Sequence, residues 1–254
     1  MCYDDQAVPP SPEGSKGSAH GEDIVLTASD GNRFSAYIAR PEHAGKAQIV
    51  IFPDVRGLHN FYKQLAMRFA EVGITALAID FFGRSAGLTS RDEPFDFWPH
   101  VQQMTLPTFF DDVKAALAYL RQDEGAQRAT FTTGFCMGGT LSFYTATQDF
   151  GFTGVTGFYS GFSRVFPGAS GPLLEEAVHI KYPVLGLYGG ADQGIPPEQV
   201  HAFDEALDKA GVEHELVIYP GATHSFFDRR YEEFADASAD AWRRVLGFIA
   251  AHTR

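Results

Sequence analysis

A cysteine stands where a serine would be expected in the glycine-rich motif GFCMGG, residues 134–139. The motif follows an apolar stretch and precedes residues that indicate the start of a helix. In G-x-S-x-G motifs the nucleophile sits on a sharp strand-to-helix turn, where the flanking glycines avoid clashes that a side chain would cause. The spacing of Gly134, Cys136 and Gly138 therefore predicts a cysteine nucleophile at such a turn.

Two further side chains could complete a catalytic triad with Cys136. Asp192 lies in YGGADQGIP and His224 lies in PGATHSF, each just beyond an apolar run. A thiol with an ordinary pKa of about 8.5 is only partly ionised at neutral pH, so it needs a histidine base and a carboxylate that orients the imidazole ring. The chain order of nucleophile, acid and histidine is the order found in α/β-hydrolases.

Backbone N–H groups are the expected donors to the oxyanion that forms when a carbonyl is attacked. The N–H of Met137 begins the helix after the nucleophile, where the helix dipole adds to its effect. A second donor should come from the loop after another strand. In the segment FPDVRGLH, residues 52–59, we assign this role to the N–H of Val55.

Each triad residue also has a purely structural interpretation. Cys136 could be a buried inert thiol, because free cysteine is commonly a small core residue. His224 could be a hydrogen-bonded structural histidine. Asp192 could cap a helix that begins near Pro196.

The elements that must position these residues alternate between buried strands and amphipathic helices. A hairpin is expected from residues 23–27 and 33–39, joined through a turn at residues 29–32. Further strands are predicted at residues 48–52, 75–81, 129–134, 155–160, 184–188 and 216–219, and helices at residues 61–72, 107–121, 197–210 and 231–251. This alternation predicts an α/β fold with a mostly parallel sheet covered by helices on both faces, and with active residues at the carboxyl ends of strands.

Two segments lie outside this pattern. Residues 1–21 are rich in Pro, Gly and Ser and are expected to form an irregular N-terminal arm, which leaves residues 22–254 as the folded domain. Residues 85–104 form the longest irregular connection between predicted elements.

Composition limits the classes of partner. The chain has 254 residues, 44% of them hydrophobic, and a net charge of −12, which argues against binding to nucleic acid or to an anionic membrane. No apolar run approaches membrane-spanning length, and the N-terminus lacks the pattern of a signal peptide. The two cysteines, Cys2 and Cys136, are a poor disulfide candidate, so a cytoplasmic protein with reduced thiols is expected. The histidines are scattered without metal-binding spacing, and we predict neither a metal nor a cofactor. The composition does not indicate an oligomeric state.

The sequence resembles the dienelactone hydrolase family, whose members are α/β-hydrolases with a cysteine where most relatives use serine. The resemblance runs from about residue 24 to the C-terminus and rests on IVIFPDVRGLH, AIDFFGR, GFCMGG, GGADQGIP and GATHSF, which occur in family order. It implies an α/β-hydrolase fold and a triad of Cys136, Asp192 and His224.

The resemblance also assigns residues around the triad. Asp54 takes the place of a family glutamate that hydrogen-bonds the resting thiol and helps to trigger its ionisation. Of two family arginines that hold the substrate carboxylate, one matches Arg84, while the other position falls on Asp228 with Arg229 beside it. Arg84 could also be an ordinary surface ion-pair partner, and Asp54 could equally be a turn residue after Pro53. Because Asp228 replaces a cation, only a weak preference for carboxylated substrates is expected, unless the side chain of Arg229 turns inward and binds the substrate in its place.

The sequence therefore predicts a hydrolase that cleaves a lactone or small carboxylic ester through a cysteine acyl-enzyme. One alternative is a small-molecule binding or sensing protein with the same fold and little turnover, although such a protein would not need a complete triad. Another is a redox-sensitive thiol protein, in which Cys2 would have to act as the resolving partner of Cys136.

Overall fold

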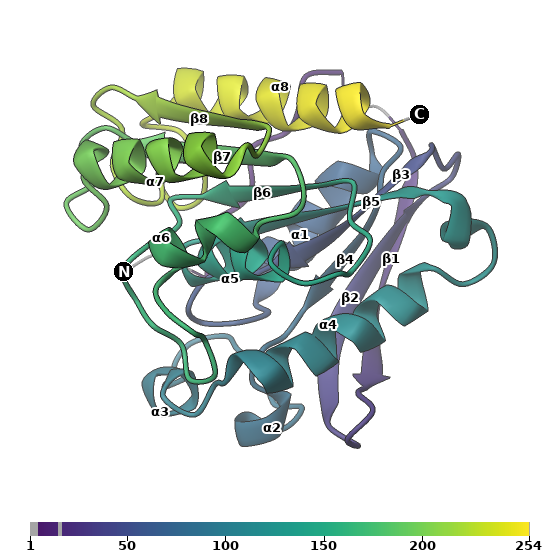
Figure 1. Ribbon diagram of the computed structural model, residues 1–254. Helices are drawn as coiled ribbons and strands as arrows, with labels where there is room; N and C mark the ends of the chain where they lie inside the picture. Colours follow the sequence, from purple (N-terminus) through teal and green to yellow (C-terminus); the bar gives the residue numbers. More distant parts are fainter. Residues whose placement is uncertain (1–4, 15–16, 254) are drawn as a thin grey trace.

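One eight-stranded sheet crosses the molecule in the order β1-β2-β4-β3-β5-β6-β7-β8 (Figure 1). The computed structural model describes residues 5–14 and 17–253. The strands are β1 (Ala19–Thr27), β2 (Arg33–Pro41), β3 (Ala47–Phe52), β4 (Thr75–Ile79), β5 (Ala129–Phe135), β6 (Gly154–Phe158), β7 (Val184–Gly189) and β8 (His214–Tyr219). The pairs β1–β2 and β2–β4 are antiparallel and all other pairs are parallel. The α/β fold expected from the sequence is confirmed.

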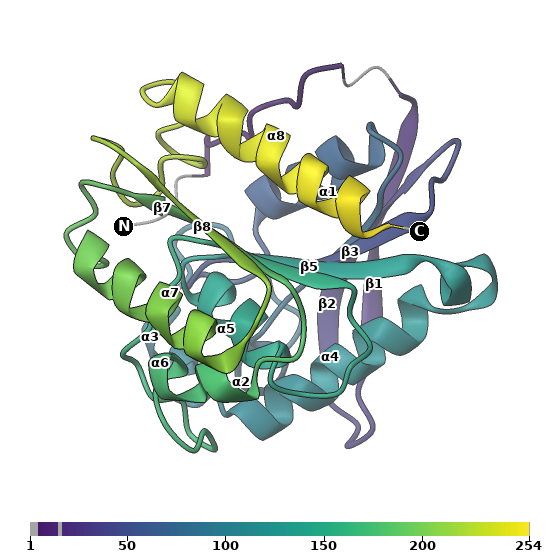
Figure 2. The same ribbon diagram turned by 45° about the horizontal axis from the view of Figure 1, so that its top comes forward.

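Helices cover both faces of this sheet. Figure 2 shows α1 (Asn60–Ala70) and α8 (Ala235–His252) on one face, where the rings of Phe69 and Trp242 lie 4.8 Å apart. The opposite face carries α4 (Leu106–Leu120), α5 (Met137–Thr145) and α7 (Pro197–Ala210). Short turns complete the chain: α2 (Gly83–Ala86), α3 (Trp98–Val101), η1 (Asp123–Gln127), α6 (Leu173–Glu176) and η2 (Ala177–His179).

Burial of the strands explains their sequences. All residues of β3, β4, β6 and β7 are buried, as expected for parallel strands covered by helices on both faces. The expected elements match the structure to within a few residues. The first strand and the last helix begin at other residues than expected. β1 begins at Ala19, inside the segment assigned to the arm, because it pairs with the whole length of β2 as far as Pro41. α8 begins at Ala235 rather than near residue 231, because the chain before it forms turns.

Before β1 the described residues of the N-terminal arm, 5–14 and 17–18, are irregular, and the arm packs on the domain. The indole Nε1 of Trp242 donates a hydrogen bond to the carbonyl of Pro10 at 2.8 Å, and Arg68 donates to Ser11 Oγ at 3.2 Å. Cys2 lies outside the described residues. Among the described helices, none combines the length and apolar composition that crossing a membrane would require.

Candidate active site

The backbone at Cys136 makes an abrupt turn between β5 and α5. Cys136 is the N-cap of α5 and has φ +54° and ψ −116°, in a region that favours glycine. A Cβ on Gly134 would lie 2.0 Å from the carbonyl oxygen of Gly138, and a Cβ on Gly138 would lie 2.0 Å from that of Pro53. The glycines are therefore required by close backbone contacts, and the turn directs the cysteine side chain outward from the end of β5.

Asp192 and His224 form a hydrogen-bonded pair beyond β7 and β8. His224 Nδ1 lies 2.6 Å from Asp192 Oδ2. The Asp192 side chain is buried, and its Oδ1 accepts N–H bonds from Gly194 at 2.8 Å and Ile195 at 3.2 Å. Asp192 does not cap α7, whose N-cap residue is Pro196. An ionised carboxylate on Nδ1 favours the tautomer in which Nε2 is the basic nitrogen.

One pocket brings most of the predicted catalytic groups together. It has a volume of about 720 Å³, and Cys136, His224, Val55 and Met137 all line it. Met137 is the first residue of α5, so its N–H lies at the positive end of the helix dipole. Aromatic side chains supply much of the remaining wall: Phe95, Phe97, Trp98, Tyr159 and Phe166. Such a pocket favours an apolar substrate body next to a small number of polar groups.

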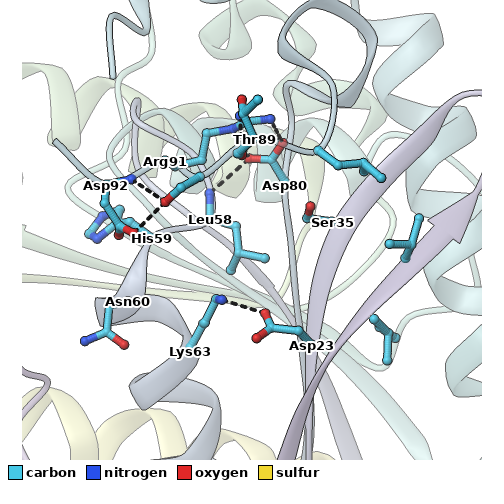
Figure 3. A pocket seen from close by; sticks show the side chains of 14 residues that line it. Asp23, Ser35, Leu58, His59, Asn60, Lys63, Asp80, Thr89, Arg91 and Asp92 are labelled. Atoms are coloured by element: carbon cyan, nitrogen blue, oxygen red, sulfur yellow. Dashed lines mark hydrogen bonds and ion pairs between the residues drawn. The ribbon is translucent and has the colours of Figure 1, made fainter. Parts of the chain in front are cut away.

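A buried ion pair anchors the long connection that supplies part of this wall. Asp80, directly after β4, accepts hydrogen bonds from Arg91 Nε at 3.1 Å and Nη2 at 2.8 Å. The N–H of Leu58 also donates to Asp80 Oδ1 at 3.1 Å. Figure 3 shows this pair beside a second cavity of about 550 Å³, between β1, the start of α1 and residues 88–92. The same connection carries residues 95–98 of the Cys136 pocket, so the ion pair holds that wall in place.

Asp54 belongs to a buried polar cluster after β3. Its Oδ1 accepts the N–H of Arg56 at 2.9 Å, and its Oδ2 lies 3.6 Å from His59 Nε2. Tyr62 on α1 belongs to no sequence motif, and its hydroxyl interacts electrostatically with the carboxylate of Asp54. Burial raises the pKa of Tyr62 well above its ordinary value, and the negative charges of Asp54 and Asp228 raise it further. Tyr62 looks in sequence like any apolar helix residue, so no local signal could have identified it.

The structure does not bring Arg84 and Arg229 to the wall of the Cys136 pocket. Arg84 forms ion pairs with Asp30 and Asp112 and lines a smaller cavity. Arg229 lines a surface pocket beside the N-terminal arm. Asp228 is buried and accepts a hydrogen bond from the hydroxyl of Tyr159 at 2.8 Å.

Arg164 lines the Cys136 pocket instead. No motif in the sequence indicates Arg164, which lies in the connection between β6 and α6.

One group of side chains has the composition of a metal site. Asp204 and Asp208 on α7 and His214 on β8 place one possible ligand atom each within 4.8 Å of one another. His214 Nε2 already pairs with Asp204 Oδ1 at 3.2 Å. The three residues do not line the Cys136 pocket.

Comparisons with known proteins show which family and which relatives this chain resembles. The model of the dienelactone hydrolase family matches residues 34–253. A carboxymethylenebutenolidase-like protein of Methylorubrum extorquens is 30% identical over 83% of this chain and 74% of its own. One from Yersinia pestis is 26% identical over 88% and 86%.

Solved structures are similar in fold. A dienelactone hydrolase-like protein of Klebsiella pneumoniae superposes with a TM-score of 0.78 at 24% identity, over 92% of this chain and 99% of its own. The acylaminoacyl peptidase of Pyrococcus horikoshii gives a TM-score of 0.74 at 16% identity, over 94% of this chain and 42% of the peptidase.

Proposed function

Because the chain belongs to the dienelactone hydrolase family and is a carboxylic ester hydrolase, we propose that it cleaves a lactone or small ester through a cysteine acyl-enzyme. One observation carries the proposal. Cys136, on its strained turn, and His224, held by the buried Asp192, line the same apolar pocket. A cysteine nucleophile favours a reducing compartment, so the proposal includes a cytoplasmic location.

The reaction begins with activation of the thiol. Nε2 of His224 takes the proton from Cys136, and the thiolate attacks the carbonyl carbon of the ester. Asp192 keeps Nδ1 protonated and stabilises the imidazolium that forms. Collapse of the tetrahedral intermediate releases the alcohol, which takes the proton back from His224. An acyl group then remains on the sulfur of Cys136.

The second half of the reaction reverses these roles. His224 removes a proton from water, the resulting hydroxide attacks the thioester, and the acid leaves as the proton returns to the thiolate. In both halves the N–H groups of Val55 and Met137 bind the oxyanion. Removal of one donor from an oxyanion hole costs about 2.7–4 kcal/mol in a serine protease, which sets the scale for each of these two N–H groups. We propose in addition that Asp54, in the buried cluster after β3, modulates the resting thiol, which is the role that the family resemblance implies for this position.

Replacement of the nucleophile tests the covalent mechanism. Cys136→Ala should abolish turnover of 4-nitrophenyl acetate, while Cys136→Ser should fold but lose most of the activity, because the site is arranged for a more acidic nucleophile. Rapid acid quenching followed by intact mass spectrometry should find the acetyl adduct in the wild type and no adduct in Cys136→Ala. Full activity in Cys136→Ala would reject the acyl-enzyme.

The same experiment separates the two alternatives. A binding protein with little turnover would bind esters without forming an adduct. A redox-sensitive protein would show a Cys136-dependent response to peroxide while ester turnover in the reduced state stayed independent of Cys136.

A further inference from the structure

Arg164 is the one lysine or arginine on the wall of the Cys136 pocket, among the residues that the structure describes. Its guanidinium carbon lies 4.7 Å from the centre of the Phe166 ring, a cation–π contact that leaves the N–H groups available. One of them, on Nη2, makes a long hydrogen bond of 3.5 Å to the carbonyl of Val101. The guanidinium is thus held beside the pocket by an aromatic face.

Among residues 5–14 and 17–253, no carboxylate forms an ion pair with this guanidinium. Partial burial lowers the pKa of Arg164, whereas its attraction to the Cys136 thiolate raises it. This attraction indicates that the guanidinium of Arg164 lies close enough to Cys136 to interact electrostatically with its thiolate. An arginine keeps its charge at neutral pH in such a setting, so the pocket contains a permanent cation.

The loop that carries Arg164 is anchored at several points. The hydroxyl of Tyr144 donates to the carbonyl of Gly171 at 2.9 Å and lies 3.4 Å from that of Arg164. The carbonyl of Pro167 accepts the N–H of Leu106 at 2.9 Å, and the side chain of Phe166 is buried. A cation on an anchored loop loses little conformational freedom when a ligand binds.

We infer that Arg164 is a specificity-determining residue that binds a carboxylate on the substrate. The preferred ester then has an aromatic or extended apolar body, which packs against Trp98, Phe97 and their neighbours, and an anionic group at the far end from the reacting carbonyl. The planar guanidinium fits a carboxylate with two parallel N–H bonds. This inference rests on the proposed ester hydrolysis, whose substrate class it specifies.

The negative charges around the pocket make the preference for a carboxylated substrate depend on Arg164. Asp96 also lines the pocket and is exposed, and the whole chain carries a net charge of −12, so the wider field repels anions. A carboxylate therefore gains affinity only by reaching Arg164. Arg84 is held by two carboxylates elsewhere, which leaves it a poor anion receptor.

Two pairs of esters test the inference, because the anionic group could belong to either half of the ester. The first pair is 4-acetoxybenzoate and 4-acetoxybenzamide, and the second is the 4-nitrophenyl monoester of adipic acid and that of its monoamide. In at least one pair Arg164→Gln should lower kcat/KM for the anion about tenfold and change it less than about twofold for the amide, a size appropriate to a partly exposed charged contact. Arg164→Lys should restore part of the loss.

Two further measurements test whether the effect of Arg164 is local and electrostatic. Arg243→Gln removes an exposed arginine on α8 and is the matched control for the change in net charge. It should leave the anion-to-amide ratio unchanged. Raising the salt concentration should reduce the ratio in the wild type and not in Arg164→Gln.

An unchanged ratio in Arg164→Gln for both pairs would overturn the inference, as would a loss that appears in Arg229→Gln instead. The neutral amides report the proposed function separately. If the wild type hydrolyses them and Cys136→Ala does not, ester hydrolysis stands whatever happens at Arg164. If Cys136→Ala hydrolyses them at the wild-type rate, the proposed mechanism itself fails.

Discussion

The contact between His224 and Asp192 is short and shielded. Asp192 accepts hydrogen bonds on both oxygens, from two backbone N–H groups and from the imidazole. The ring of Tyr159 lies 4.8 Å from that of His224 and limits its rotation. A carboxylate held this firmly can fix the tautomer of the histidine without itself taking part in proton transfer.

Asp192→Asn should keep the fold and slow the reaction. An amide can donate to Nδ1 and so stabilise the wrong tautomer, which lowers kcat by about a hundredfold or more. The measurement is kcat with 4-nitrophenyl acetate, and far-ultraviolet circular dichroism checks the fold. A wild-type rate in Asp192→Asn or in His224→Ala would show that another group acts as the base.

At the scale of elements, the carboxylate of Asp112 links α4 to the β1–β2 turn and to α2. Asp112 on α4 accepts hydrogen bonds from Asn32 beside the β1–β2 turn at 2.9 Å and from Arg84 on α2 at 2.8 Å. Burial raises the pKa of Asp112 to about 6, although both hydrogen bonds act to lower it. The folded protein therefore holds a proton here at pH values where the unfolded chain has lost it.

This proton makes stability depend on pH. From about pH 4 to about pH 6 the folded state binds more protons than the unfolded state, so the free energy of unfolding should fall as the pH rises, by about 3 kcal/mol for this group. Asp112→Asn has no such group and should lack this component. Urea unfolding of both proteins at pH 4, 5, 6 and 7 measures the difference in their free energies of unfolding at each pH. A constant difference between wild type and variant would contradict the expected shift.

At the scale of the whole molecule, the beginning of the chain contacts the segment that carries Val55, the proposed oxyanion donor. The fully buried Arg56, next to Val55, pairs with Asp5 Oδ1 at 2.8 Å and approaches Glu93 Oε1 at 3.8 Å. The N–H of Glu93 donates to Asp5 Oδ2 at 2.8 Å. Asp5 thus joins the arm, the loop after β3 and the connection that forms the pocket wall.

Asp5→Ala should therefore lower both stability and activity. Loss of the partner weakens the pairing of a buried charge and should cost about 2–3 kcal/mol of unfolding free energy. The double variant Asp5→Ala/Arg56→Met removes the buried guanidinium as well and should recover most of that stability. If Asp5 positions the Val55 N–H through Arg56, kcat should stay low in the double variant while KM changes little. A recovery of kcat together with stability would limit Asp5 to a structural role.

The order of strands and helices and the class of fold could be predicted from the sequence alone, and so could the candidates for a catalytic triad. Apolar periodicity and glycine spacing are local properties, and residues 129–139 specify a buried strand, a sharp turn and a helix without reference to the rest of the chain. The family motifs likewise identify Cys136, Asp192 and His224 as candidates, because each lies just beyond an apolar run that forms a strand.

Only the tertiary structure decided which charged residues line the Cys136 pocket. Arg84 lies in a family motif but is held by Asp30 and Asp112, whereas Arg164 lies in no motif and lines the pocket. Asp5 reaches Arg56 across about fifty residues of sequence, and no local pattern encodes such a pair. The physical reason is that the energy of a charge depends on the partners and solvent around it, and the fold brings those partners together from distant parts of the chain.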